Sequence, residues 1–115
     1  MKTSELNGVA LDWAVAKSEL LSGADYTLAI DKDMGVYRVN FGGMYPEWVK
    51  DWKEGGELIE SKGISIWMFD DVTWKAQLDA NSEAFEGATP LIAAMRCYVA
   101  SKLGDDVAVP ADLYK

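Results

Sequence analysis

Hydrophobic residues near the end of the chain recur every three or four positions, which predicts a helix over residues 90–103. Thr89 suits the N-cap, and Pro90 suits the first helical position because its missing N–H would have no partner there. Gly104 suits the left-handed residue that follows a helix. Both ends of this helix are therefore predicted from local sequence.

A second helical pattern covers residues 8–21, with Asn7 as a candidate cap. Its apolar side includes Trp13, which we expect to be a core residue. The same pattern leaves Asp12 and Glu19 on the side expected to face water.

Two stretches alternate between apolar and polar residues, which is typical of half-buried strands. Residues 25–30 and 36–41 flank a polar turn and predict a β-hairpin. Residues 64–69 and 72–78 flank a second turn and predict another hairpin. The polar, weakly patterned residues 79–86 are expected to form a loop.

The stretch between the hairpins, residues 44–56, is rich in aromatic and acidic side chains. Pro46 suits the start of a short helix, which the glycines at 55 and 56 are expected to stop. Trp48 and Trp52 are four residues apart, so on such a helix they would share a face. The stretch has the composition of a functional loop and equally of a loop that caps a small core.

These elements predict an α+β fold in a single domain, residues 1–115. Two terminal helices would pack on one face of an antiparallel sheet of about four strands. The expected order is helix, hairpin, loop, hairpin, helix.

The net charge of −8 disfavours direct binding to nucleic acid or to an anionic membrane surface. It suits an acidic protein that stays in solution, and it also suits a DNA mimic that occupies the basic groove of an enzyme. No run approaches the roughly 20 apolar residues that span a membrane. We therefore expect a protein that is neither inserted into a membrane nor exported.

The chain has one cysteine, Cys97, and no histidine. These counts exclude an intrachain disulfide and disfavour the usual zinc sites, serine–histidine and cysteine–histidine catalysis. The acidic pair Glu57 and Glu60 is far from the ligand spacing of a calcium loop. The chain is therefore predicted to be no enzyme and to need no cofactor, with a carboxylate-dependent metal enzyme as the least favoured alternative.

Arg96 lies in the middle of the C-terminal helix among apolar and small residues. A guanidinium beside apolar surface pairs with a carboxylate of the protein or with an anionic group of a ligand. Both roles remain open from the sequence, with the structural ion pair favoured.

Residues 89–105 resemble the C-terminal part of the NinX-like family of bacteriophage proteins. Residues 2–6 and 10–17 are similar to the start of that family, and residues 51–56 to its centre, although Glu57 stands where the family usually has proline. The resemblance implies a small accessory protein of a tailed phage or prophage, made in the host bacterial cytoplasm. It implies no particular reaction.

The preferred hypothesis is capture of a nucleotide-like small molecule, in counter-defence or host takeover, because bases stack on aromatic rings and phosphates bind Arg and free amides. The expected ligand-binding residues are Tyr45, Trp52, Gly55, Gly56, Trp74 and Arg96. The alternative is an acidic module that inhibits a host nuclease or defence protein, with contact residues Trp48, Trp67, Glu57 and Glu60. Five tryptophans in so small a chain also favour an exposed apolar patch, and with it a homodimer.

Overall fold

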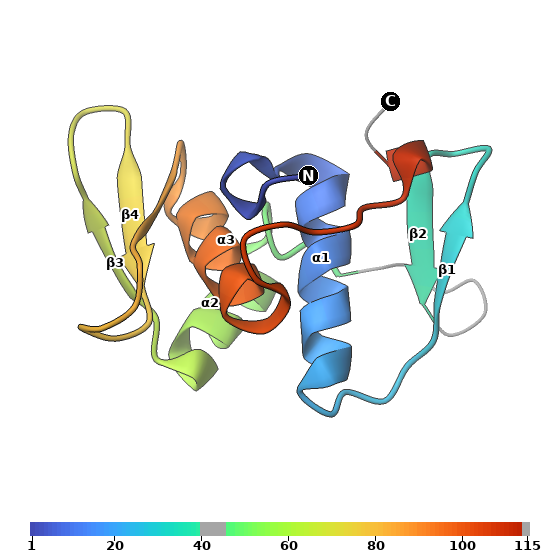
Figure 1. Cartoon of the computed structure of the whole chain (residues 1–115), viewed down its shortest axis with the longest axis horizontal. Coiled ribbons are helices and arrows are strands. Elements are labelled where there is room, and N and C mark those ends of the chain that lie inside the picture. Colours follow the sequence, from blue (N-terminus) through green and yellow to red (C-terminus); the bar gives the residue numbers. More distant parts are fainter. Residues whose placement is uncertain (40–45, 114–115) are drawn as a thin grey trace.

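The computed structural model describes residues 1–39 and 46–113 (Figure 1). The predicted α+β class is confirmed. In chain order the elements are η1 (Thr3–Glu5), α1 (Gly8–Leu21), β1 (Leu28–Asp31), β2 (Val36–Val39), α2 (Trp52–Lys62), β3 (Ser65–Met68), β4 (Trp74–Gln77), β5 (Phe85–Gly87), α3 (Pro90–Leu103) and η2 (Ala111–Leu113).

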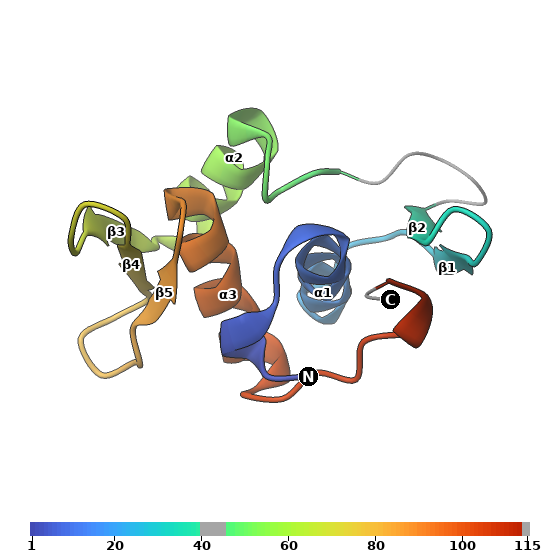
Figure 2. The same cartoon turned by 90° about the horizontal axis from the view of Figure 1, so that it is seen from above.

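The strands form two small antiparallel sheets at opposite ends of the molecule, with the helices between them (Figures 1 and 2). The β3–β4–β5 sheet packs on α3, α3 packs on α1 and α2, and the β1–β2 hairpin lies beyond α1. The expected single sheet of about four strands is therefore wrong in its connectivity. The two predicted hairpins do form, but they do not pair with each other, because α1 and α3 separate them.

Helix α3 is the central element, as its sequence pattern predicted. The Thr89 hydroxyl accepts a hydrogen bond from the Ile92 N–H at 3.1 Å, which caps the first turn. Gly104 follows the last residue with a φ of 84°. Because the helix contacts the sheet on one side and α1 on another, residues around most of its circumference are buried.

The third strand of the larger sheet, β5, lies where the sequence indicated a loop. Its three residues pair with β4, with Ala76 opposite Phe85 and Trp74 opposite Gly87. Phe85 is buried against α3 while Glu86 is exposed. A strand this short contains one full alternation, which is too little for a periodic signal.

Asp12 was expected to face water, and this expectation is wrong. Its side chain is 3% exposed, and its Oδ1 accepts a hydrogen bond from the Val49 N–H at 3.0 Å. Glu19, from the same expected side, is half-buried and accepts a hydrogen bond from the Tyr98 hydroxyl at 2.5 Å. Helix α1 is covered on several sides, so apolar periodicity does not separate its inner and outer faces.

Helix α2 continues through the two glycines that were expected to stop a helix. The Asp51 carboxylate caps its start by accepting the Lys53 N–H at 2.9 Å, and Gly63 ends it with a left-handed φ of 68°. Gly55 lies where the helix meets its neighbours, since a Cβ added there would lie 2.4 Å from the Trp48 carbonyl oxygen. Trp48 precedes the helix instead of sharing its face.

The first residues of the chain meet the segment that follows α3. Lys2 forms a β-bridge with Asp106, and the Thr3 hydroxyl donates to the Gly104 carbonyl at 2.6 Å. Among the described residues, no helix has the length and apolar character needed to cross a membrane.

Candidate functional site: an exposed hairpin surface

The six residues expected to bind a nucleotide-like ligand lie in different environments. Tyr45 is outside the described residues. Trp52 is 56% exposed at the start of α2, and Trp74 is half-buried on β4. Gly55 is buried, and its N–H already donates to the Asp51 carbonyl at 2.8 Å, while Gly56 lies next to it in the helix.

Arg96 has main-chain partners among the described residues, and not the carboxylate partner favoured from the sequence. Its Nε donates to the Leu6 carbonyl and its Nη1 to the Glu86 carbonyl, both at 2.7 Å. Partial burial lowers the pKa of the guanidinium from its usual range. Arg96 thus joins the N-terminal segment and β5 to α3, which is a structural role. Nucleotide capture stays a prediction that the observed contacts of Arg96 and Gly55 do not favour.

The four residues of the alternative interaction site also lie in different environments. Trp48 is 7% exposed and belongs to the hydrophobic core, so it cannot be part of an exposed contact surface. Glu57 and Glu60 are exposed on α2. Trp48 and Glu57 do meet, at a cavity of 340 Å³ that Glu54 also lines. Trp67 on β3 is 37% exposed, and three other exposed hydrophobic residues lie within five positions of it in the sequence.

These exposed hydrophobic residues lie at the turn end of the β3–β4 hairpin. Eight large hydrophobic side chains are exposed among the described residues, and four of them fall within six positions of this hairpin. We define the hairpin surface as these four, Trp67 (37% exposed), Met68 (56%), Phe69 (57%) and Val72 (75%). Large apolar side chains that are exposed close together in a monomeric protein often mark an interaction site.

The strand register explains why Trp67 is uncovered. Ile66 pairs with Ala76 on the face that packs against α3, so Trp67 and its partner Lys75 point to the opposite, open face. Met68 lies opposite Trp74 on the same side of the sheet as Ile66, but in the last pair before the turn, where it is 56% exposed. The turn itself projects beyond the helices (Figure 1). No described element covers the outer face of this sheet.

Hydrogen bonds fix the turn that carries Phe69 and Val72. The Phe69 N–H donates to the Thr73 carbonyl at 2.9 Å, and the Val72 N–H donates to Asp70 Oδ1 at 2.9 Å. The Val72 N–H is also the main cause that lowers the pKa of Asp70, so this carboxylate stays charged. The apolar side chains are therefore displayed on an ordered turn, which lowers the entropic cost of binding a partner.

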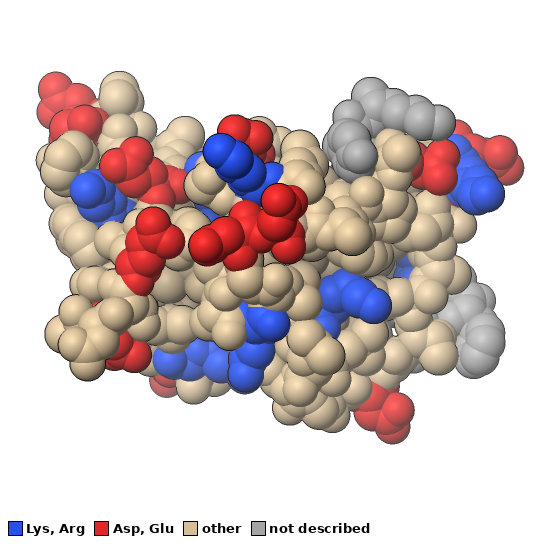
Figure 3. All heavy atoms as spheres, in the orientation of Figure 1, with Lys and Arg blue, Asp and Glu red and all other residues tan. Residues whose placement is uncertain are grey.

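Charged groups surround the hairpin surface. Lys75 Nζ lies 3.9 Å from the centre of the Phe69 ring and 3.6 Å from Glu86 Oε1, so it holds the aromatic ring beside an ion pair. Asp70 and Asp71 are exposed in the turn. Figure 3 shows acidic side chains gathered over this end of the sheet. The arrangement is an apolar centre with a mainly acidic border.

Sequence reasoning identified Trp67 but missed Met68, Phe69 and Val72. The available signal was the run of residues 64–69, in which hydrophobic residues occupy both strand faces at its end. In a small antiparallel sheet with helices on one side, half of such a run must face water.

The comparisons with known proteins agree with the resemblance seen in the sequence. A comparison with curated proteins found no match. Residues 2–102 match the family described as "Bacteriophage P22, NinX". This match spans η1 to the last turn of α3 and includes the hairpin surface, so the chain belongs to the NinX family of bacteriophage proteins.

Proposed function

We propose that this protein acts without catalysis, by binding a host protein through the hairpin surface. The observation that carries the proposal is the concentration of Trp67, Met68, Phe69 and Val72 at the end of β3 and on the ordered turn that follows it. Exposed Trp and Met side chains are enriched at protein interfaces, and a tryptophan often contributes most of the binding energy.

The charge pattern specifies the partner further. The acidic border of the surface and the net charge of −8 favour a partner with an apolar hollow and a basic rim. A host nuclease or another defence protein that binds nucleic acid has basic surface of this kind. Blocking such a surface would serve a phage gene product, and this step rests on family membership.

Affinity capture from bacterial lysate tests the proposal with a matched pair of variants. Trp67→Ser combined with Phe69→Ser removes two exposed aromatics from the hairpin surface. Trp52→Ser removes a tryptophan that is more exposed than Trp67, from the start of α2. The proposal predicts a protein that the wild type and Trp52→Ser retain and that the hairpin variant loses.

The retained protein should then bind the purified wild type directly by calorimetry. Loss of two interface aromatics should weaken that binding by roughly 10²-fold or more. Retention by all three proteins, or by none, would contradict the proposal. Sedimentation of the purified protein tests whether a second copy of the chain binds the hairpin surface instead. A dimer that the hairpin variant abolishes would assign the surface to self-association and overturn the proposal.

A further inference from the structure

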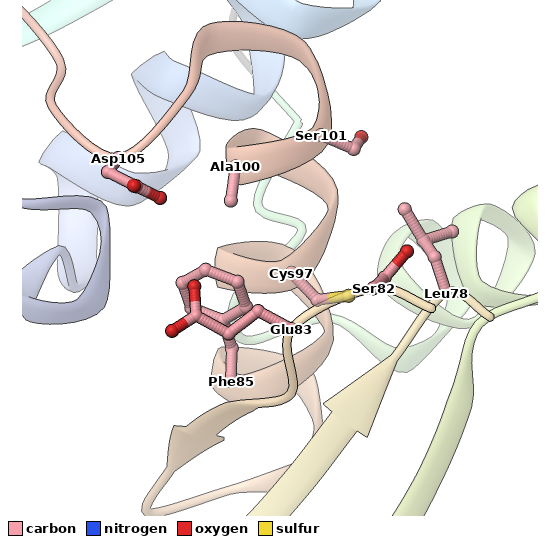
Figure 4. Close-up of a pocket in the computed structure, with 8 residues that line it drawn as sticks. All are labelled: Leu78, Ser82, Glu83, Phe85, Cys97, Ala100, Ser101 and Asp105. Atoms are coloured by element: carbon pink, nitrogen blue, oxygen red, sulfur yellow. The ribbon is translucent and has the colours of Figure 1, made fainter. Parts of the chain in front are cut away.

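A cavity of 220 Å³ lies between the C-terminal half of α3 and the segment that joins β4 to β5 (Figure 4). The segment that joins β4 to β5 lies at the other end of the sheet from the β3–β4 turn (Figure 1), and the cavity lined by this segment is therefore separate from the hairpin surface. Its lining residues are Leu78, Ser82, Glu83, Phe85, Cys97, Ala100, Ser101 and Asp105.

One side of the cavity is apolar and uncharged. Phe85 and Cys97 are 8% and 2% exposed, and they face the cavity together with Leu78 (Figure 4). Burial raises the pKa of the Cys97 thiol to about 11, so it stays neutral at physiological pH. This side offers apolar contacts for the aliphatic chain of a ligand, with the Phe85 ring beside it.

The mouth of the cavity carries two carboxylates, Glu83 and Asp105, which also line an adjoining cavity of 330 Å³. Both residues are exposed. Neighbouring Asp106 is paired with the N-terminal ammonium at 2.9 Å, whereas the Glu83 and Asp105 side chains have no ion pair or hydrogen bond with the described residues. Lys2 lines the adjoining cavity only. The mouth of the smaller cavity is therefore negative.

We propose that this cavity binds a small organic cation, an alkylguanidinium or alkylammonium group. Glu83 and Asp105 would provide the counter-charges, and Leu78, Phe85 and Cys97 would contact the stem. An aromatic ring beside a cation adds a further attraction. The volume is below that of a site for a drug-sized ligand, so the ligand is a fragment or a single basic side chain.

Titration with n-butylguanidinium, followed by ¹H–¹⁵N NMR spectra of the full chain, tests the site. For eight heavy atoms we expect a Kd on the order of 1–10 mM. Amide shifts should be confined to residues 78–85 and 97–105. The neutral isostere n-butylurea should bind at least about tenfold more weakly, since it lacks the charge.

The double variant Glu83→Gln and Asp105→Asn should lose about tenfold in affinity. The double variant Glu57→Gln and Glu60→Gln, which changes the net charge equally at exposed positions on α2, should bind like the wild type. Because all four residues are exposed, both variants should keep the wild-type thermal midpoint within a few degrees.

The cation has two possible sources, a free small molecule or an arginine side chain of a peptide. Arginine with blocked amino and carboxyl groups distinguishes them. Tighter binding of the blocked arginine than of n-butylguanidinium assigns the site to an arginine of a peptide, and the reverse assigns it to a free cation. Saturating shifts of equal size with n-butylurea, unchanged affinity of the Glu83 and Asp105 variant, or no shifts would each overturn the proposal.

Discussion

Asp12 provides the sharpest quantitative test of the fold, because a buried carboxylate is expensive to keep charged even with hydrogen bonds from the Val49 and Trp48 N–H groups. Burial raises its pKa to about 7 from an ordinary value of 3.8, and the charge of Glu47 adds to the increase. The Val49 N–H, the charge of Lys50 and the Trp48 N–H lower the pKa and so oppose the increase. Asp12→Asn keeps the shape and the acceptor oxygen while removing the titration.

The sign of the pH effect follows from the two pKa values. Between pH 3.8 and about 7 the folded protein holds a proton on Asp12 that the unfolded chain has released. The stabilisation due to this proton is complete below pH 3.8 and is lost as the pH rises to about 7. At 1.36 kcal/mol per pKa unit, the loss is at most about 4 kcal/mol.

Asp12→Asn should therefore resemble the wild type at pH 4 and become more stable than it as the pH rises. At pH 8 we expect a gain of about 2–4 kcal/mol, since the second polar atom of the amide must also find a partner. Urea unfolding monitored by tryptophan fluorescence, at one-unit steps from pH 4 to pH 8, measures the difference.

Asp33→Asn, on the exposed β1–β2 turn, removes one negative charge without a buried group. Its difference from the wild type should stay within about 0.5 kcal/mol at each pH. A stability difference between Asp12→Asn and the wild type that does not change from pH 4 to pH 8 would refute the reasoning. It would mean that Asp12 is fully charged and satisfied in the folded protein.

Two further substitutions test how the helices are held. Gly55→Ala should destabilise the fold by about 2–4 kcal/mol in urea unfolding, because the added Cβ would lie 2.4 Å from the Trp48 carbonyl oxygen, and a stability equal to wild type would contradict this packing. Arg96→Met should cost about 2–4 kcal/mol and increase hydrogen exchange in β5, because the Leu6 and Glu86 carbonyls lose their charged donors; unchanged exchange would contradict the structural role.

The elements whose determinants are local could be predicted from the sequence. Helix α3 was identified with both ends because Thr89 and Gly104 act on adjacent residues. The β1–β2 hairpin was identified because its strands and turn are contiguous, with Leu28 to Asp31 paired to Val36 to Val39. Caps and short turns depend on neighbours in the chain, which a single sequence contains.

The errors arose where distant residues decide the structure. Glycine usually weakens a helix, but Gly55 is needed in α2 because the Trp48 carbonyl and Leu91 approach it closely. Asp12 is polar in a helix that is buried on several sides, and its partner Val49 is 37 residues away. Arg96 looked like a candidate ligand contact, yet its partner Leu6 is 90 residues away. Sequence spacing carries no information on such contacts.

The outer face of the β3–β4–β5 sheet shows why the hairpin surface is not a simple consequence of a small core. Away from the turn, this uncovered face is polar: Lys75 pairs with Glu86, and Gln77 donates to the Ser82 carbonyl at 2.7 Å. The same strands thus carry polar side chains on the part of the open face that lies away from the turn. At the turn end, by contrast, the exposed side chains are apolar, and hydrogen bonds fix the turn beside them. Such exposure lowers the solubility of the protein and adds nothing to its core. Packing within the described chain does not explain this arrangement, which is the reason for proposing a binding role.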